Sequence, residues 1–175
     1  NVAMGYQALD AETGGQESVD IGAHPIIKKN YTSGTRPGNN ALGLSAGASI
    51  TSGINNTAIG TFTLDALTDA DYNVAVGTTA LTADTLGSYS TAIGYNALAA
   101  QNKTTATNTF NTAVGAGAGE KVTTGVFNTL LGASAGEDLT DADGNIAVGY
   151  QAMQNDQQGS GSIAIGAQAL YTINV

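Results

Sequence analysis

Residues 56–60 read Asn-Thr-Ala-Ile-Gly and residues 73–77 read Asn-Val-Ala-Val-Gly, and this five-residue motif decides the fold. Ten copies of the motif run along the 175-residue chain, with successive final glycines 17 residues apart except at two intervals of 21. Such a regular period indicates a repeat architecture in which stacked units share one core. The structural glycines are Gly5, Gly22, Gly43, Gly60, Gly77, Gly94, Gly115, Gly132, Gly149 and Gly166.

The repeat has a second level, because the pattern of intervals recurs after 72 residues. At this offset the segment 65–73, Asp-Ala-Leu-Thr-Asp-Ala-Asp-Tyr-Asn, matches the segment 137–145, Glu-Asp-Leu-Thr-Asp-Ala-Asp-Gly-Asn. No linker separates the blocks, and we expect the array to continue beyond this segment. The chain is therefore predicted to be one continuous repeat domain over 1–175, with four-coil blocks at 1–72 and 73–144 and a partial block at 145–175.

Each motif has the composition of a short β-strand. The residue three before the glycine is β-branched in nine of the ten copies, and the residue before the glycine is always Ile, Val, Leu or Met. Alanine stands between them in eight copies. Side chains alternate between the two faces of a strand, so one face carries the larger residues and the other the alanines. Because both faces are apolar, we expect both to be buried.

Seventeen residues are too few for a strand-helix-strand crossover, which takes about 30 residues. The period predicts an all-β fold, a parallel β-solenoid (β-roll) of about ten 17-residue coils, each with two short strands and two bends. Alanines three residues after the glycine, such as Ala80 and Ala97, are expected to start the second strand. Coils with an Ala-Gly pair there, at Gly47, Gly119 and Gly136, are expected to be thinner. Ten coils at strand spacing predict a rod about 48 Å long.

The first motif residue is Asn in seven copies and Ser in three, which predicts a polar ladder along the stack. A coil this short encloses only one thin apolar layer. The strand face that is not inside must then be covered by neighbouring copies, so the sequence predicts an oligomer.

Composition narrows the classes of function. The net charge of −9 argues against nucleic acid and anionic membrane surfaces as partners. No apolar run is long enough for a transmembrane helix, and no signal-like segment opens the sequence. The chain has no cysteine and one histidine, and no serine has an evident base partner, so an enzyme is not expected.

Two phrases carry a family resemblance: Ser-Thr-Ala-Ile-Gly-Tyr-Asn-Ala-Leu at 90–98 and Ser-Ile-Ala-Ile-Gly-Ala-Gln-Ala-Leu at 162–170. They resemble the head repeats of trimeric autotransporter adhesins and similar repeats of phage tail-fibre proteins. The resemblance covers nearly the whole chain, although adhesin heads usually have a shorter coil. It implies a left-handed homotrimer and an extracellular fibre segment, on a virion tail or a bacterial surface, that binds a host glycan or protein receptor.

The two 21-residue intervals are candidate recognition loops, because each must accommodate four extra residues. Four of the five basic residues and both prolines lie in them. The plainer interpretation is that such insertions are tolerated decorations, since lengthening a loop costs little entropy. The candidate receptor contacts are His24, Lys28, Lys29, Tyr31, Arg36 and Lys103.

An Asp-x-Asp-x-Asn spacing occurs twice and offers several oxygens to a calcium ion. The full calcium-loop signature is missing, and an acidic turn before a strand explains the same residues. No other cofactor is expected. The weak calcium candidates are Asp69, Asp71, Asn73, Asp141, Asp143 and Asn145.

Three other functions are alternatives to the fibre. A self-assembling extracellular filament without a receptor is the main alternative. An ice-binding solenoid requires threonines in register, and Thr61, Thr63, Thr78 and Thr79 do not repeat in this way. A hexapeptide-repeat acyltransferase requires an aliphatic residue every six positions and a functional histidine, and the 17-residue motif argues against it.

Overall fold

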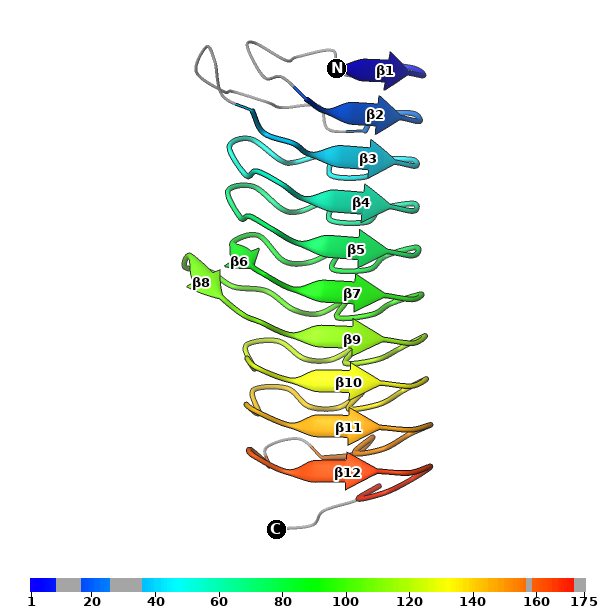
Figure 1. The fold of residues 1–175 in the computed structure, drawn as a ribbon, viewed down its shortest axis with the longest axis vertical. Coiled ribbons are helices and arrows are strands. Elements are labelled where there is room, and N and C mark those ends of the chain that lie inside the picture. Colours follow the sequence, from blue (N-terminus) through cyan, green and yellow to red (C-terminus); the bar gives the residue numbers. More distant parts are fainter. Residues whose placement is uncertain (9–16, 26–35, 157–158, 172–175) are drawn as a thin grey trace.

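The chain is described by a computed structural model that covers residues 1–8, 17–25, 36–156 and 159–171. Within these ranges the secondary structure consists of twelve short strands and no helix. Ten of them stack into one sheet, and β6 and β8 form a small pair beside it (Figure 1). The sheet contains β1 (Val2–Met4), β2 (Val19–Ile21), β3 (Asn40–Leu42), β4 (Thr57–Ile59), β5 (Val74–Val76), β7 (Thr91–Ile93), β9 (Thr112–Val114), β10 (Thr129–Leu131), β11 (Ile146–Val148) and β12 (Ile163–Ile165).

Every neighbouring pair in the sheet is parallel and joins the same position of the repeat. Ala58 of β4 is opposite Ala75 of β5, which is opposite Ala92 of β7. The predicted parallel β-solenoid with a 17-residue spacing is therefore confirmed. The 21-residue intervals do not shift this register, since Thr91 is still opposite Thr112.

The second long interval leaves the coil at a defined place. Before it, Thr85 contacts Asn102 at an offset of 17 residues, and after it the N–H of Thr109 donates to the carbonyl of Ser88 at an offset of 21. The four extra residues therefore leave between Lys103 and Thr109, where β8 (Thr107–Asn108) pairs with β6 (Gly87–Ser88). The corresponding part of the first long interval lies in 26–35, outside the described residues.

The core is a thin double layer. From β3 onward the central strand residue points inward and is at most 2% exposed. Alanines three residues after the glycine face it from the other side of the coil, followed by larger side chains such as Leu81, Leu98 and Met153. The alanine ladder is thus the inner face of the sheet.

The expectation of a second strand in each coil is wrong. The segment after each glycine is a run of turns in which the second and fourth residues have positive φ, as at Thr79 (58°) and Leu81 (50°). Their N–H groups point in opposite directions: Thr79 donates to the carbonyl of Thr61 in the coil before, and Leu81 to that of Ala97 in the coil after. Each coil is hydrogen-bonded to both neighbours on this side without a strand.

Two of the three coils with Ala-Gly pairs, those of Gly119 and Gly136, are filled from the opposite side. Gly119 and Gly136 have φ of 60° and 59°, the same conformation as the leucines at this position in other coils. A Cβ at either glycine would lie within 2.7 Å of the side chain of Leu130, which replaces the usual alanine in β10. One large residue in the strand therefore occupies the space that two glycines leave.

The predicted polar ladder is confirmed. The buried Asn128 accepts a hydrogen bond from the N–H of Asn145 through Oδ1 (2.9 Å), and its Nδ2 donates to the carbonyl of Ala142 (2.8 Å). The same pair of bonds recurs at Asn56 and Asn73. The ladder satisfies buried backbone groups where the chain enters each strand.

Candidate interaction surface

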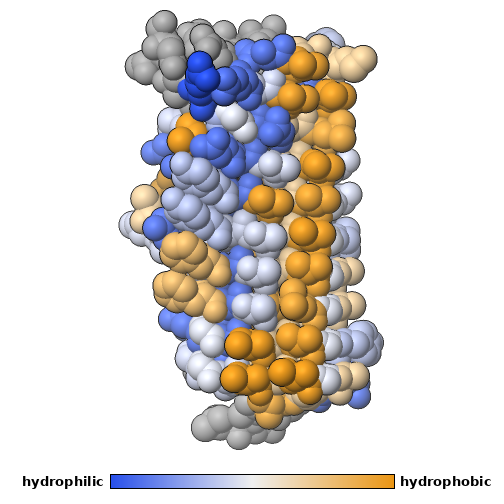
Figure 2. Space-filling view, viewed as in Figure 1, coloured by the Kyte–Doolittle hydropathy of each residue, from blue (hydrophilic) through white to orange (hydrophobic). Residues whose placement is uncertain are grey.

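The outward face of the ten-stranded sheet carries the larger apolar side chains. Ile59, Ile93 and Leu131 are 37–39% exposed, whereas the intervening Ala58 and Ala92 are at most 1% exposed. Figure 2 shows a hydrophobic column along nearly the whole length of this face, with a paler column next to it. A shallow apolar hollow of about 260 Å³ lies over β2 to β4. The inner face is buried as expected, but in the single chain the outer face remains open.

The outward face has almost no charge. Side chains alternate, so the residues five, three and one before each glycine point outward and form three rows. Among the described positions of these rows, Glu17 is the one charged residue, and it pairs with Arg36 (2.8 Å). The acidic excess of the chain is thus concentrated away from the sheet face.

A row of stacked aromatic rings borders this face and was not predicted. Tyr72 stacks on Tyr89 with ring centroids 5.0 Å apart, Tyr89 on Phe110 at 5.2 Å, and Phe110 on Phe127 at 5.7 Å. All four rings are 41–58% exposed. They lie five residues before consecutive motif glycines, so aligning the repeat at this position would have revealed them.

These aromatic residues adopt an unusual backbone conformation. Their φ values are 50–63°, in the left-handed region that bulky residues rarely occupy. Other coils place Asn55, Gly144 or Gly161 at the same position, residue types that tolerate this conformation. Strain of this kind is found at functional sites more often than elsewhere. The aromatic row is therefore a candidate for function as well as for coil stacking.

The middle outward row contains threonines in register. Thr57, Thr91, Thr112 and Thr129 align along the sheet, interrupted by Val74. Thr61, Thr63, Thr78 and Thr79 lie after the motif glycines and outside this row, so the expectation that no threonines are in register is wrong for the strands. The row lies between the aromatic and aliphatic rows, on the same outward face.

The candidate recognition residues are only partly described. His24 is half-buried and packs edge-on against Tyr6, with ring centroids 5.2 Å apart. Arg36 is exposed and paired with Glu17. Lys28, Lys29 and Tyr31 lie outside the described residues. Where they are described, these residues do not gather into one site.

Lys103 was expected to be an exposed receptor contact, but it is buried, at 7% exposed. Its backbone N–H donates to Asp84 Oδ1 (3.1 Å), and its Nζ donates to the carbonyl of Thr124. Burial lowers the pKa of its ammonium group, while the charge of Asp84 acts in the opposite direction. Lys103 thus helps to anchor the base of the second insertion. The exposed residues of the insertion are Thr104, Thr105, Ala106 and Asn108.

The acidic turns hold neighbouring coils together. Asp71 and Asp143 each accept a backbone N–H from the previous coil, at 2.8 and 2.7 Å. Asn73 and Asn145 belong to the buried polar ladder and use Oδ1 there. Asp69 and Asp141 accept from the hydroxyls of Ser52 and Thr140. Among the described residues no group of three His, Cys, Asp or Glu is arranged to hold a metal ion, so calcium gains no geometric support.

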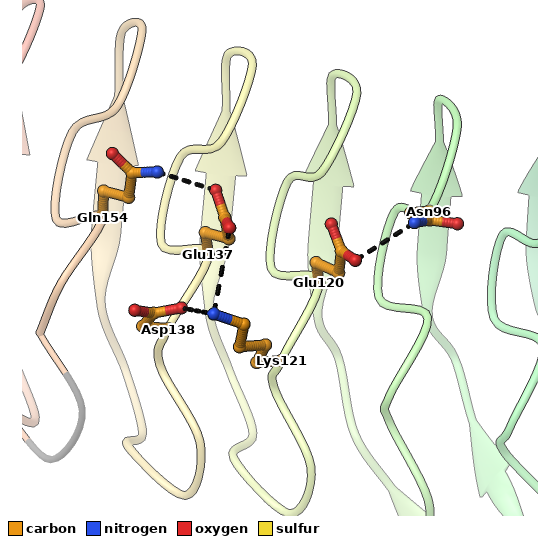
Figure 3. A network of polar contacts seen from close by, with 6 residues as sticks. All are labelled: Asn96, Glu120, Lys121, Glu137, Asp138 and Gln154. Carbon is orange, nitrogen blue, oxygen red and sulfur yellow. Dashed lines mark hydrogen bonds and ion pairs between the residues drawn. The ribbon is translucent and has the colours of Figure 1, made fainter.

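Polar contacts also connect the coils on the turn side (Figure 3). Lys121 Nζ lies 2.5 Å from Asp138 Oδ1 and 4.0 Å from Glu137 Oε1, and this hydrogen bond to Asp138 raises the pKa of Lys121. Gln154 donates to Glu137 at 2.8 Å. The Lys121 side chain is largely exposed, and Glu137, Asp138 and Gln154 are half-buried, so water still screens these contacts and each stabilises the rod only modestly.

Comparison with known proteins gives no relative. No family model matches the chain, and neither does any curated protein or any solved structure. The described residues contain no helix that could span a bilayer. The candidate surface must therefore be interpreted from its own geometry.

Proposed function

We propose that this chain is a structural segment of an extracellular fibre, which assembles with copies of itself through the outward sheet face and spaces or presents a receptor-binding surface. The single observation that carries the proposal is the uncharged, apolar face on a ten-stranded sheet. Isolated exposed apolar residues are common on proteins, but continuous rows of them indicate an interface.

The dimensions of the face suit a protein interface. Ten strands at about 4.8 Å spacing and three outward rows about 7 Å apart give a surface of roughly 1,000 Å². A standard interface buries about 800 Å² on each partner, and the largest apolar patches of monomers reach roughly 300–600 Å². Covering this face with other copies would remove it from water along the whole rod.

The rod geometry supports a spacing role. Each added coil lengthens the solenoid by one strand spacing without changing its cross-section. The second insertion projects from the side of the stack, where a loop is able to contact a receptor while the core stays regular. The resemblance to adhesin heads and phage tail fibres supports three copies and a location on a bacterial surface or virion, with a host glycan or protein as the partner.

The mass of the assembly in solution tests this proposal. We expect the wild-type chain to sediment as a trimer, and Ile59→Asp and Ile93→Asp to shift the mass toward one chain, because each places a carboxylate in the apolar rows. Thr104→Asp adds the same charge at the exposed insertion and should leave the mass unchanged. A wild-type chain that sediments as a monomer, or an unchanged mass for both isoleucine variants, would overturn the proposal.

The threonine row favours a second candidate, a surface that binds a regular lattice such as ice. Thr57, Thr91, Thr112 and Thr129 present hydroxyls on a flat face next to aliphatic side chains. This function requires the face to be free of other copies. Ice recrystallisation inhibition by the wild-type chain, lost in Thr91→Lys and retained in Thr104→Lys, would support it over the fibre.

A further inference from the structure

The 72-residue duplication contains two equivalent turns that differ in one side chain. Asp71 Oδ1 accepts the N–H of Ile54 and the Asp71 N–H donates to Ser88 Oγ. Asp143 makes the corresponding bonds to Val126 and Ser160, with lengths that agree within 0.1 Å. The residue that follows is Tyr72 in the first copy and Gly144 in the second. The backbone is thus the same, and only the second copy lacks the ring.

The missing ring leaves an open position at the end of the aromatic row. Phe127 stacks on Phe110 on one side, and on its other side the next coil has Gly144. A Cβ at Gly144 would meet no atom within 4 Å, and the same holds at Gly161 one coil further. Phe127 is correspondingly the most exposed ring of the row, at 58%.

A carboxylate lies beside this open position. Asp143 is exposed, and its Oδ1 is held 2.7 Å from the N–H of Val126, the residue before Phe127. Asp143 is in none of the ion pairs of the described residues, which involve Lys121 and Arg36, although its charge acts at longer range on the Lys103 ammonium group. An aromatic face and an anionic group are therefore presented together on a chain of net charge −9.

We propose that Phe127, Asp143 and the space over Gly144 form a binding site for a planar cation, the guanidinium group of an arginine on a partner protein or peptide. A guanidinium stacks on an aromatic face and pairs with a carboxylate at the same time. The guanidinium group would lie over Gly144, one coil from Phe127. In the first copy of the duplication, the ring of Tyr72 occupies the equivalent place. This site is independent of the proposed assembly and goes beyond it by naming the chemistry of a partner.

Other ligands fit this position less well. A lysine ammonium is a compact, strongly hydrated charge that does not match a flat face in the same way. A sugar needs several directed hydrogen bonds, and the Asp143 carboxylate and the Ser160 hydroxyl beside the open position each already accept a backbone N–H. The negative charge of the chain also attracts a cationic partner and gives no preference for a neutral one.

The test is an NMR titration of the assembled wild-type protein with the peptide acetyl-Gly-Arg-Gly-amide, following the amide signals of Phe127, Gly144 and Gly161. We expect saturable shifts at these residues. The peptide with citrulline in place of arginine has the same shape without the charge, and it should bind about ten-fold more weakly. Absence of a saturable shift with the arginine peptide, or equal binding of the citrulline peptide, would overturn the proposal.

Three variants locate the site. Gly144→Tyr should abolish binding because it fills the open position, and the equivalent Tyr72 with φ of 58° indicates that the fold accepts this residue. Phe127→Ala removes the ring and should also abolish binding, while Asp143→Asn should weaken it about five-fold. Asp69→Asn is the matched control at another exposed acidic turn and should bind like wild type. Undiminished binding by Gly144→Tyr, or saturable shifts with methyl glucoside in place of the arginine peptide, would refute the assignment.

Discussion

The two sides of each coil keep the same 17-residue period by different means. On the strand side, three residues per coil form an ordinary parallel ladder around a small central alanine. On the turn side, alternating left-handed residues direct successive N–H groups to the coil before and the coil after, around larger leucines. Regular stacking thus needs hydrogen bonds at a fixed repeat but does not need a strand on both sides.

The comparison also separates the sources of stability. The strand side depends on close backbone approach and on the buried asparagine ladder. The turn side depends on burying leucine side chains, which offsets the strain of their positive φ values. Substitutions on each side should therefore destabilise the rod for different physical reasons.

The largest effect is expected at the glycine that joins the two sides. In Gly94→Ala the new Cβ would clash with the carbonyl oxygen of Gly115, at a φ of 137° that disfavours side chains. We expect the free energy of unfolding to fall by about 4 kcal/mol in denaturant titrations at fixed protein concentration. Gly144→Ala, which meets no atom within 4 Å, should cost only about 1 kcal/mol. Equal losses for the two variants would mean that the glycine column is not the constraint.

A smaller loss is expected on the turn side. Leu98 is fully buried, so Leu98→Ala should lower the free energy of unfolding by about 3 kcal/mol through lost burial and a cavity. The control is Leu44→Ala, because Leu44 is 42% exposed and should cost less than about 1 kcal/mol. If thermal and denaturant unfolding give similar losses for both leucines, the turn side does not rely on its buried side chains.

The smallest of the three effects concerns the asparagine ladder. Asn128→Ala leaves the buried N–H of Asn145 and the carbonyl of Ala142 without their side-chain partner. We expect a loss of about 2 kcal/mol in the free energy of unfolding, and faster hydrogen exchange at the Asn145 amide. The control is Asn102→Ala, because Asn102 is exposed. It should change neither the free energy of unfolding nor the exchange rate of the Asn145 amide. An unaltered exchange rate at Asn145 would show that water replaces the ladder freely.

The solenoid and its polar ladder were predictable because they follow from positions that every coil shares. Alternation within Asn-x-Ala-x-Gly fixes which residues face inward, and the glycine spacing fixes the register. The second strand was predicted wrongly because the left-handed positions carry ordinary residues such as Thr79 and Leu81, whose types do not indicate positive φ. Hydrogen bonds between coils hold them in a conformation that local preference disfavours.

The candidate surface was only partly predictable. The apolar outward rows are visible in the sequence, but their exposure in the single chain is a property of the fold. The aromatic row spans one 21-residue interval, between Tyr89 and Phe110, so its regularity appears only when the register is known. Lys103 was misplaced because a basic residue in an insertion looks exposed, whereas its stem lies at the base of the loop.

The second insertion leaves the stack without shifting its register. The length of the rod and the sequence of this loop are therefore independent of each other. Reach depends on how many coils are stacked, and each coil can be duplicated or lost without disturbing the register of the others. Under the proposed function, the partner that the rod binds would depend on the exposed residues 104–106, which the parallel ladder does not use. Evolution, or a protein engineer, can therefore alter the length of the rod and the sequence of its loop independently, by copying coils in one case and by grafting a new loop in the other.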